Sequence, residues 1–214
     1  MAEAKDAVFS RLDLSTSIDL SGDPEDNFMR PFSGTGYGYF DKKVCFEDGV
    51  PDAAIQRVGH IDGWYMDFSQ AEASVYDLLD EDADTEPFVC LYKSDGSFDP
   101  IVVDLLSVDP YGISPNYLLV FHVLYIEPEF RGHNFAGSFF NETIKALRGD
   151  ADVIALDVSP LQISGWGKKE EYDLDKFGGW GESESIKKLS HHYSKFGFKA
   201  VPDSTVMIAF RDWF

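Results

Sequence analysis

This chain of 214 residues has few cysteines, no long apolar run and few basic residues. The two cysteines, Cys45 and Cys90, lack the spacing of a metal or redox site and are interpreted as free thiols in a reducing compartment. No stretch of about 18 apolar residues occurs, so no transmembrane helix is expected. The first residues also lack the basic start and apolar core of a secretory signal. These absences together predict a cytoplasmic protein.

The charge is strongly negative and unevenly distributed. The net charge is −20, with 24 acidic and 7 basic residues in 1–110 and 14 acidic and 11 basic residues in 111–214. Such a field repels nucleic-acid phosphates and anionic membranes, so we expect neither as a partner. It favours a cationic ligand over the N-terminal half. The alternative is that the acidity only maintains solubility or reflects a salty habitat.

The apolar pattern predicts an α/β (α+β) fold, with helices on both faces of a sheet. The glycine-rich patch 34–40 is interpreted as a turn or aromatic loop, and residues 52–80 as helical material broken around Gly59 to Gly63. The expected helices are 69–79, 135–147 and 185–196, and the expected strands are 88–93, 101–108, 117–126, 153–158 and 206–210. Residues 1–60 are expected to pack on or complete a main domain of residues 61–214, which has an inserted loop at about 163–183.

One turn between an expected strand and helix gives the strongest functional signal. The strand ends at Ile126, and Pro128 cannot continue the ladder through its own nitrogen. Small and polar residues then open a helix, whose free backbone amides and dipole are suited to a diphosphate. Arg131 adds a positive charge, and the small residues 136–138 let phosphates approach the backbone. An ordinary turn without a ligand is the alternative.

The same turn resembles a known family signature. Ile126-Glu-Pro-Glu-Phe-Arg-Gly-His-Asn-Phe-Ala is similar to the acyl-CoA motif of the GNAT acetyltransferase superfamily: Arg or Gln, two residues, Gly, one residue, then Gly or Ala. Arg131 fills the first place and Ala136 the last. Asn134 stands where the first glycine is usual, and asparagine tolerates a left-handed backbone better than most residues.

A second landmark follows downstream. His192-Tyr-Ser-Lys-Phe-Gly-Phe-Lys resembles the late helix of that superfamily, with Tyr193, Gly197 and Phe198 in the usual places. The resemblance covers roughly residues 88–210. It implies a GNAT-like, mostly antiparallel mixed sheet with a splayed central strand pair.

The resemblance also implies a reaction: acetyl-CoA gives its acetyl group to a primary amine by direct attack. The strand end and the following amides would hold acetyl-CoA. The implied cofactor-binding residues are Leu124, Tyr125, Ile126, Arg131, Gly132, His133, Asn134, Phe135, Ala136 and Gly137. No metal is expected, because the adjacent His191 and His192 point about 100° apart on a helix.

Two residues are candidates for proton transfer. Tyr193 matches the family's tyrosine and is the candidate acid; the alternative is a tyrosine packed on the core. His122, nine positions before Arg131, is the candidate base, because serotonin-type acetyltransferases carry a catalytic histidine at a similar place. A water-linked carboxylate is the other candidate base, and a hydrogen-bonded core histidine is the structural alternative. Asp157 and Gln162 are tentative acceptor-site residues.

Strand alternation predicts that Val120, His122 and Leu124 share one face of their strand. The expected acceptor is a cationic small molecule, such as a polyamine or an aminoglycoside-like compound, or a basic peptide. The protein is expected to be a monomer or homodimer. The alternative functions are a non-catalytic acyl-CoA-binding protein and an acidic interaction protein on the same scaffold.

Overall fold

The computed structural model describes residues 7–16, 28–40, 54–69, 71, 73–80, 83–147, 149–160 and 181–214. The seven strands among these residues form one sheet in the order β1-β2-β3-β4-β5-β7-β6. The strands are β1 (Ala7–Thr16), β2 (Met29–Phe40), β3 (Gln56–Asp67), β4 (Tyr117–Ile126), β5 (Val153–Asp157), β6 (Lys199–Ala200) and β7 (Val206–Phe210). Only the β4–β5 pair of this described sheet is parallel.

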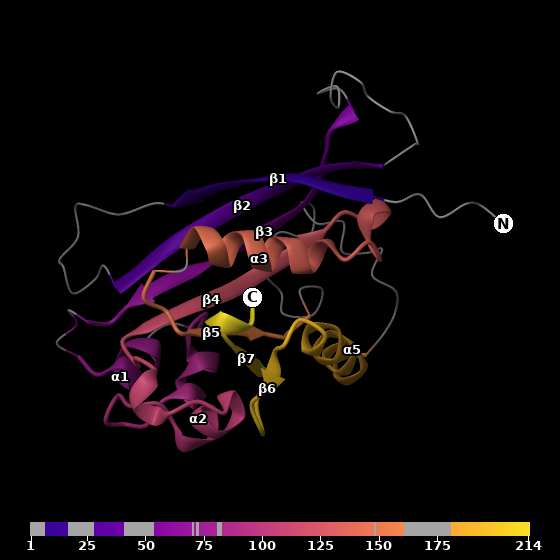
Figure 1. Cartoon of the computed structure of the whole chain (residues 1–214). Helices are drawn as coiled ribbons and strands as arrows, with labels where there is room; N and C mark the ends of the chain where they lie inside the picture. The colour runs from indigo at the N-terminus through magenta and orange to yellow at the C-terminus, as the bar shows by residue number, and fades with distance from the viewer. Residues whose placement is uncertain are drawn as a thin grey trace.

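Helices cover both faces of the sheet and enclose two apolar cores. The helical elements are α1 (Val75–Asp80), η3 (Glu86–Leu91), α2 (Pro100–Leu106), η4 (Pro110–Gly112), η5 (Pro128–Phe130), α3 (Phe135–Leu147), α5 (Glu182–Ser194) and η7 (Arg211–Trp213). Helix α3 lies across the long strands (Figure 1) and shares one core with α5, whereas α1, η3 and α2 share the other. Along β4, Leu119 and Phe121 enter the first core, and Leu118 and Val120 enter the second. The predicted mixed, mostly antiparallel sheet with helices on both faces is confirmed.

Most predicted elements that follow residue 110 are confirmed. The bounds of β4, α3 and β7 are those predicted from the sequence, and β5 ends one residue early. Helix α5 begins and ends a few residues before the predicted range. The expected loop at 163–183 lies almost wholly outside the described residues.

Two predicted strands between residues 88 and 108 are wrong. Residues 88–93 fall mainly in η3, where Phe88 and Leu91 are buried at the three-residue spacing of a 3₁₀ turn. Residues 101–108 fall mainly in α2, because the Asp99 side chain accepts a hydrogen bond from the Ile101 amide at 2.9 Å and caps the helix. An apolar run this short does not by itself distinguish a strand from a buried helix.

The predictions for the two glycine-containing segments before residue 68 are also wrong. The patch 34–40 belongs to β2, and the predicted helical material around Gly59 and Gly63 belongs to β3. A Cβ atom on Gly59 or Gly63 would collide with a backbone oxygen of β4, and one on Gly36 would collide with the Phe139 ring. These glycines therefore let a strand or a helix approach closely, and they do not break the strands.

The other elements of the N-terminal half are α1 and the first strands of the sheet. The predicted helix 69–79 is reduced to α1, which begins after Ser74, whose hydroxyl accepts a hydrogen bond from the Asp77 amide. Residue 60 falls inside β3, and β1 and β2 are the first strands of the same sheet. None of the helices in the described part of the chain is long and apolar enough to cross a membrane.

Candidate active site

The central parallel pair separates halfway along β4. Residues Leu118 to Phe121 of β4 pair with Val153 to Leu156 of β5, and no ladder pair joins these strands after Phe121. The second half of β4 continues to Ile126 with β3 alone as its described ladder partner. Backbone groups on this edge of β4 can therefore pair with an extended ligand, except the Ile126 carbonyl oxygen, which accepts a hydrogen bond from Arg131 Nε.

A β-bulge lies where the two strands part. In the β3–β4 ladder Asp62 pairs with Val123 and Gly63 pairs with Phe121, so His122 is the extra residue of β4. The bulge shifts the alternation, and Leu124 packs against the same core as Phe121. The prediction that Val120, His122 and Leu124 share a face is therefore wrong. The His122 ring instead lies 4.6 Å from the Trp64 ring, measured between centroids.

Between β4 and α3 the chain has two residues in a left-handed conformation. Gly132 has a φ of 84° and Asn134 has a φ of 61°. The asparagine thus adopts the conformation for which glycine is the usual choice. None of the described residues lies within 4 Å of a Cβ atom built on Gly132, so they leave this side of the turn open. Successive left- and right-handed residues aim their amides into a shared concavity that binds anions.

The amides of this turn are available to a ligand. The amides of Glu127, Phe130 and Arg131 bond to backbone carbonyls. By contrast, no described protein group accepts a hydrogen bond from the backbone amides of residues 132–137. The first amides of an α-helix have no partner within the helix, so α3 adds its dipole to this set.

Arg131 fastens the turn to the end of β4. Its Nε donates a hydrogen bond to the Ile126 carbonyl oxygen at 2.9 Å, and its guanidinium carbon lies 5.7 Å from the centre of the Tyr125 ring. The side chain therefore fixes the angle at which the chain leaves the strand, in addition to placing a positive charge there.

A cavity of about 610 Å³ brings the turn together with α5. We call it the α3-side cavity. Its lining residues come from β4, the turn, the start of α3 and α5: Leu124, Ile126, Phe130, Arg131, Gly132, Asn134, Phe135, Ala136, Leu189, His192, Tyr193, Lys195 and Phe196. Eight of the residues predicted from sequence are in this set.

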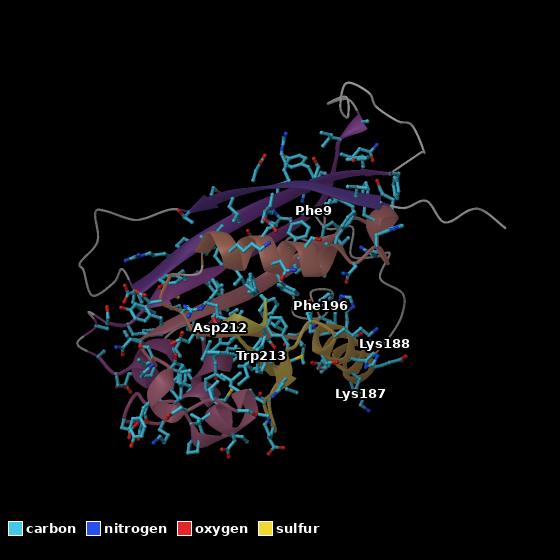
Figure 2. All side chains as sticks on the ribbon, in the orientation of Figure 1. Phe9, Lys187, Lys188, Phe196, Asp212 and Trp213 are labelled. Carbon is cyan, nitrogen blue, oxygen red and sulfur yellow. The ribbon has the colours of Figure 1, made fainter. Side chains whose placement is uncertain are left out.

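Three predicted cofactor-binding residues, Tyr125, His133 and Gly137, are not among the residues that line the cavity. Tyr125 is 4% exposed and its hydroxyl hydrogen-bonds the Glu127 carboxylate at 3.3 Å. The His133 ring packs against Phe40. A Cβ atom on Gly137 would lie 2.9 Å from the Phe196 ring, which Figure 2 shows beneath α3. Gly137 therefore permits close packing of α3 on Phe196, and the approach of phosphates to its backbone stays a prediction.

Tyr193 enters the α3-side cavity from α5. Its ring packs edge-on against Phe140, at 5.9 Å between centroids. Burial raises the pKa of Tyr193 to about 12, so the phenol keeps its proton throughout the neutral range. A protonated hydroxyl in the cavity that Leu124 and Ile126 also line can donate a proton to a basic leaving group.

The cavity carries positive charge although the protein is strongly acidic. Arg131 and Lys195 lie in its lining. Burial lowers the pKa of His192, and the nearby Lys195 and His191 lower it further. The two permanent cations suit an anionic ligand in a molecule whose net charge is −20.

Of the two tentative acceptor-site residues, only Asp157 lies in the described part of the chain. Asp157 ends β5, where its carboxylate accepts a hydrogen bond from the Ser159 amide at 3.1 Å, and it does not line the α3-side cavity. Gln162 lies outside the described residues. His60 and Asp62, which were not predicted as site residues from the sequence, form a pair that lines a second cavity together with His122.

No group of three or more His, Cys, Asp or Glu side chains within the described ranges is arranged to hold a metal ion. Cys90 is an exposed free thiol.

Comparison with known proteins gives distant likenesses only. No family model and no curated protein matches the chain. Among solved structures it is similar to a mutant of KacT, at 8% identity and a TM-score of 0.42 over 95% of this chain and 96% of that one. It is also similar to nourseothricin acetyltransferase, at 11% identity and a TM-score of 0.34 over 97% and 89% of the two chains. For NAA60 of Arabidopsis thaliana in complex with a bisubstrate analogue, the values are 9% and 0.32 over 86% and 77%.

The chain's own topology carries the assignment of its fold. Its parallel pair β4–β5 separates after Phe121, an amide-rich turn leads from β4 into α3, and Tyr193 of α5 faces that turn across a cavity. The chain therefore has the mostly antiparallel mixed sheet with a splayed central strand pair that the resemblance implied.

Proposed function

We propose that the protein is an acyl-CoA-dependent N-acetyltransferase that moves an acetyl group from acetyl-CoA to a primary amine. The observation that supports this most is the composition of the α3-side cavity. It combines an open strand edge, backbone amides without a described protein acceptor, two cations and a protonated tyrosine. The alternative of a purely structural turn leaves this combination unexplained.

The α3-side cavity fits the chemistry of acetyl-CoA. The amides of residues 132–137 and the α3 dipole are suited to its diphosphate. The free edge of β4 after Phe121 offers peptide groups to the amide-containing pantetheine arm. Apolar side chains such as Leu124 and Leu189 cover the remainder.

The acetyl transfer needs three proton movements. Acetyl-CoA supplies a thioester: the amine nitrogen bonds to its carbonyl carbon while the carbon–sulfur bond breaks. His122 takes the proton that the ammonium must lose before its nitrogen can attack. Tyr193 gives a proton to the departing sulfur, and the second proton of the nitrogen restores the phenol.

Binding of acetyl-CoA is tested by thermal unfolding. A ligand that binds only the native state at about 100 times its dissociation constant adds about 2.7 kcal/mol of stability. For a chain of this size we expect a rise in Tm of roughly 5 to 10 °C at millimolar acetyl-CoA. S-Acetylcysteamine, which has the thioester but no diphosphate, should give no shift.

A matched pair of variants locates the binding site. Ala136→Glu places a carboxylate inside the α3-side cavity and should abolish the shift, whereas Ala146→Glu, near the end of the same helix and exposed, should retain it. The absence of any shift in the unmodified protein would refute the proposal. A shift without release of CoA thiol in the presence of any amine would favour the non-catalytic binding protein.

A further inference from the structure

The face of the sheet opposite α3 has a second cavity, of about 590 Å³, formed by strands β1 to β4. We call it the β3 cavity. The side chains that give it polar character are Ser15, Ser33, His60, Asp62, Trp64 and His122. Its position follows from the strand register, because residues directly opposite in an antiparallel pair point to the same face. Ser33 pairs with Asp62, and Phe32, which is buried in the α3 core, pairs with Gly63 and points the other way.

The β3 cavity has the opposite chemistry to the α3-side cavity. His60 Nε2 and Asp62 Oδ2 are 2.8 Å apart, and their side chains are 13% and 24% exposed. Asp62 is the one carboxylate among the described residues that line this cavity, and neither lysine nor arginine is among them. A half-buried carboxylate held by an imidazole is a site for one ammonium group.

An aromatic ring and hydroxyl groups complete the lining. Trp64 is the type of side chain whose face attracts a cation most strongly. Ser15 and Ser33 supply hydroxyls at the rim, and the Ser15 hydroxyl donates to the Ser33 carbonyl oxygen at 3.3 Å. These groups suit a ligand that has its own hydroxyls to hydrogen-bond.

The two cavities approach the same short segment of β4. His122, the bulge residue, lines the β3 cavity, and Leu124 lines the α3-side cavity. Phe121, immediately before the bulge, is the last residue paired with β5. An amine in one cavity and a thioester in the other would therefore meet where β4 and β5 part.

We propose that the β3 cavity binds the acceptor, and that the acceptor is a small hydroxylated monoamine such as an amino sugar. The Asp62 carboxylate holds its ammonium against Trp64, and His60 positions that carboxylate. A polyamine fits less well, because among the described lining residues the single carboxylate of Asp62 serves only one of its charges. This inference rests on the proposed acetyltransferase function, and it narrows the acceptor to one chemical class.

Steady-state release of CoA thiol tests the acceptor class. At saturating acetyl-CoA, the probes are glucosamine, cyclohexylamine, which lacks hydroxyls, and spermidine. We expect kcat/KM to be highest for glucosamine. A preference for spermidine or cyclohexylamine would overturn the class that we infer.

Variants test the residues. Asp62→Asn should raise KM for glucosamine roughly 10- to 100-fold and leave the acetyl-CoA thermal shift unchanged, since charged hydrogen bonds are lost only on the acceptor side. Trp64→Leu should raise the same KM roughly 3- to 10-fold. Glu142→Gln, which removes an exposed carboxylate on α3, is the matched control and should change neither quantity. An unchanged KM for glucosamine in Asp62→Asn would overturn the site.

Calorimetry separates this inference from the proposed function. Glucosamine is titrated into the unmodified protein and Asp62→Asn without acetyl-CoA. Binding that Asp62→Asn loses supports the β3 cavity even if acetyl-CoA gives no thermal shift. An acetyl-CoA shift with glucosamine binding equal in both proteins supports the acetyltransferase and rejects the β3 cavity as its acceptor site.

Discussion

The two cavities have similar volumes, about 610 and about 590 Å³, but different construction. The α3-side cavity is built largely from main chain at a turn and from the apolar face of a helix, and its cations are Arg131 and Lys195. The β3 cavity is built from side chains on the flat face of four strands, and its charged pair is His60 with Asp62. One strand, β4, separates them.

The difference shows how an acidic protein can accommodate two ligands of opposite charge. A net charge of −20 repels an anion such as acetyl-CoA at long range. Screening limits that repulsion to about 8 Å at physiological ionic strength, so local cations and amides dominate inside the α3-side cavity. The same overall field favours entry of an ammonium on the β3 side. The sheet thus separates the cationic α3-side cavity from the acidic β3 cavity, and the two cavities approach each other only at β4.

Removal of the tyrosine hydroxyl is the strongest way to sharpen this comparison. Tyr193→Phe should lower kcat roughly 100- to 10,000-fold, because general acid catalysis contributes about that much. The thermal shift with acetyl-CoA and the affinity for glucosamine should both stay unchanged, since the hydroxyl acts only on the departing sulfur. Stopped-flow or steady-state thiol release measures kcat.

The control for this variant is Tyr111→Phe, because Tyr111 is 98% exposed. It should leave turnover unaltered. Equal turnover in Tyr193→Phe and the unmodified protein would remove the acid role and leave Tyr193 as a packing residue.

A substitution behind the α3-side cavity tests whether the two cavities are independent. Gly137→Ala places a methyl group 2.9 Å from the Phe196 ring, which itself lines that cavity. We expect a loss of about 1 to 3 kcal/mol in the free energy of unfolding, as for other overpacked sites. Acetyl-CoA affinity should fall, and glucosamine affinity should not. Urea unfolding and calorimetry measure these quantities.

Gly112→Ala is the matched control, because its added methyl group would have only an ordinary contact with Asp109 at 3.6 Å. An equal loss of affinity for both ligands in Gly137→Ala would show that the cavities act as one unit.

The part of the fold that was predicted from sequence is the part whose signals are local. The strand 117–126 is a long apolar run, Pro128 stops it, and the helix 135–147 has a clear apolar face. Each of these signals can be read without knowing the partner of the segment. The late-helix motif likewise singled out Tyr193, which lies on α5 and packs against Phe140 of α3.

The predictions from sequence were wrong where the structure of a segment depends on the segment that it packs against. Gly59 and Gly63 act as breakers in isolation, yet β3 requires them because β4 passes too close for a side chain. The bulge at His122 depends on the register with β3, which no local pattern reveals. The stretch 59–63 that holds His60 and Asp62 was expected to break the helical material of residues 52–80, so no common face was predicted for their side chains. In a strand they share a face, and the pair becomes visible only there.

The smallest predicted effect concerns the pH dependence of stability. Burial raises the pKa of Tyr193 to about 12 from an ordinary value of 10.0, so the folded state holds this proton more tightly than the unfolded state. The stability that results is complete below about pH 10 and is lost as the pH rises towards 12.

Tyr193→Phe has no such proton. The free energy of unfolding of the unmodified protein should therefore fall relative to that of Tyr193→Phe, by roughly 1 kcal/mol between about pH 9 and about pH 11. Burial also raises the pKa of Tyr65 and Tyr92, but both are present in the two proteins and cancel in the difference. Urea unfolding of both proteins at the two pH values measures it. Parallel pH profiles would mean that the Tyr193 hydroxyl is accessible to water, which would weaken its assignment as an acid held protonated beside the α3-side cavity.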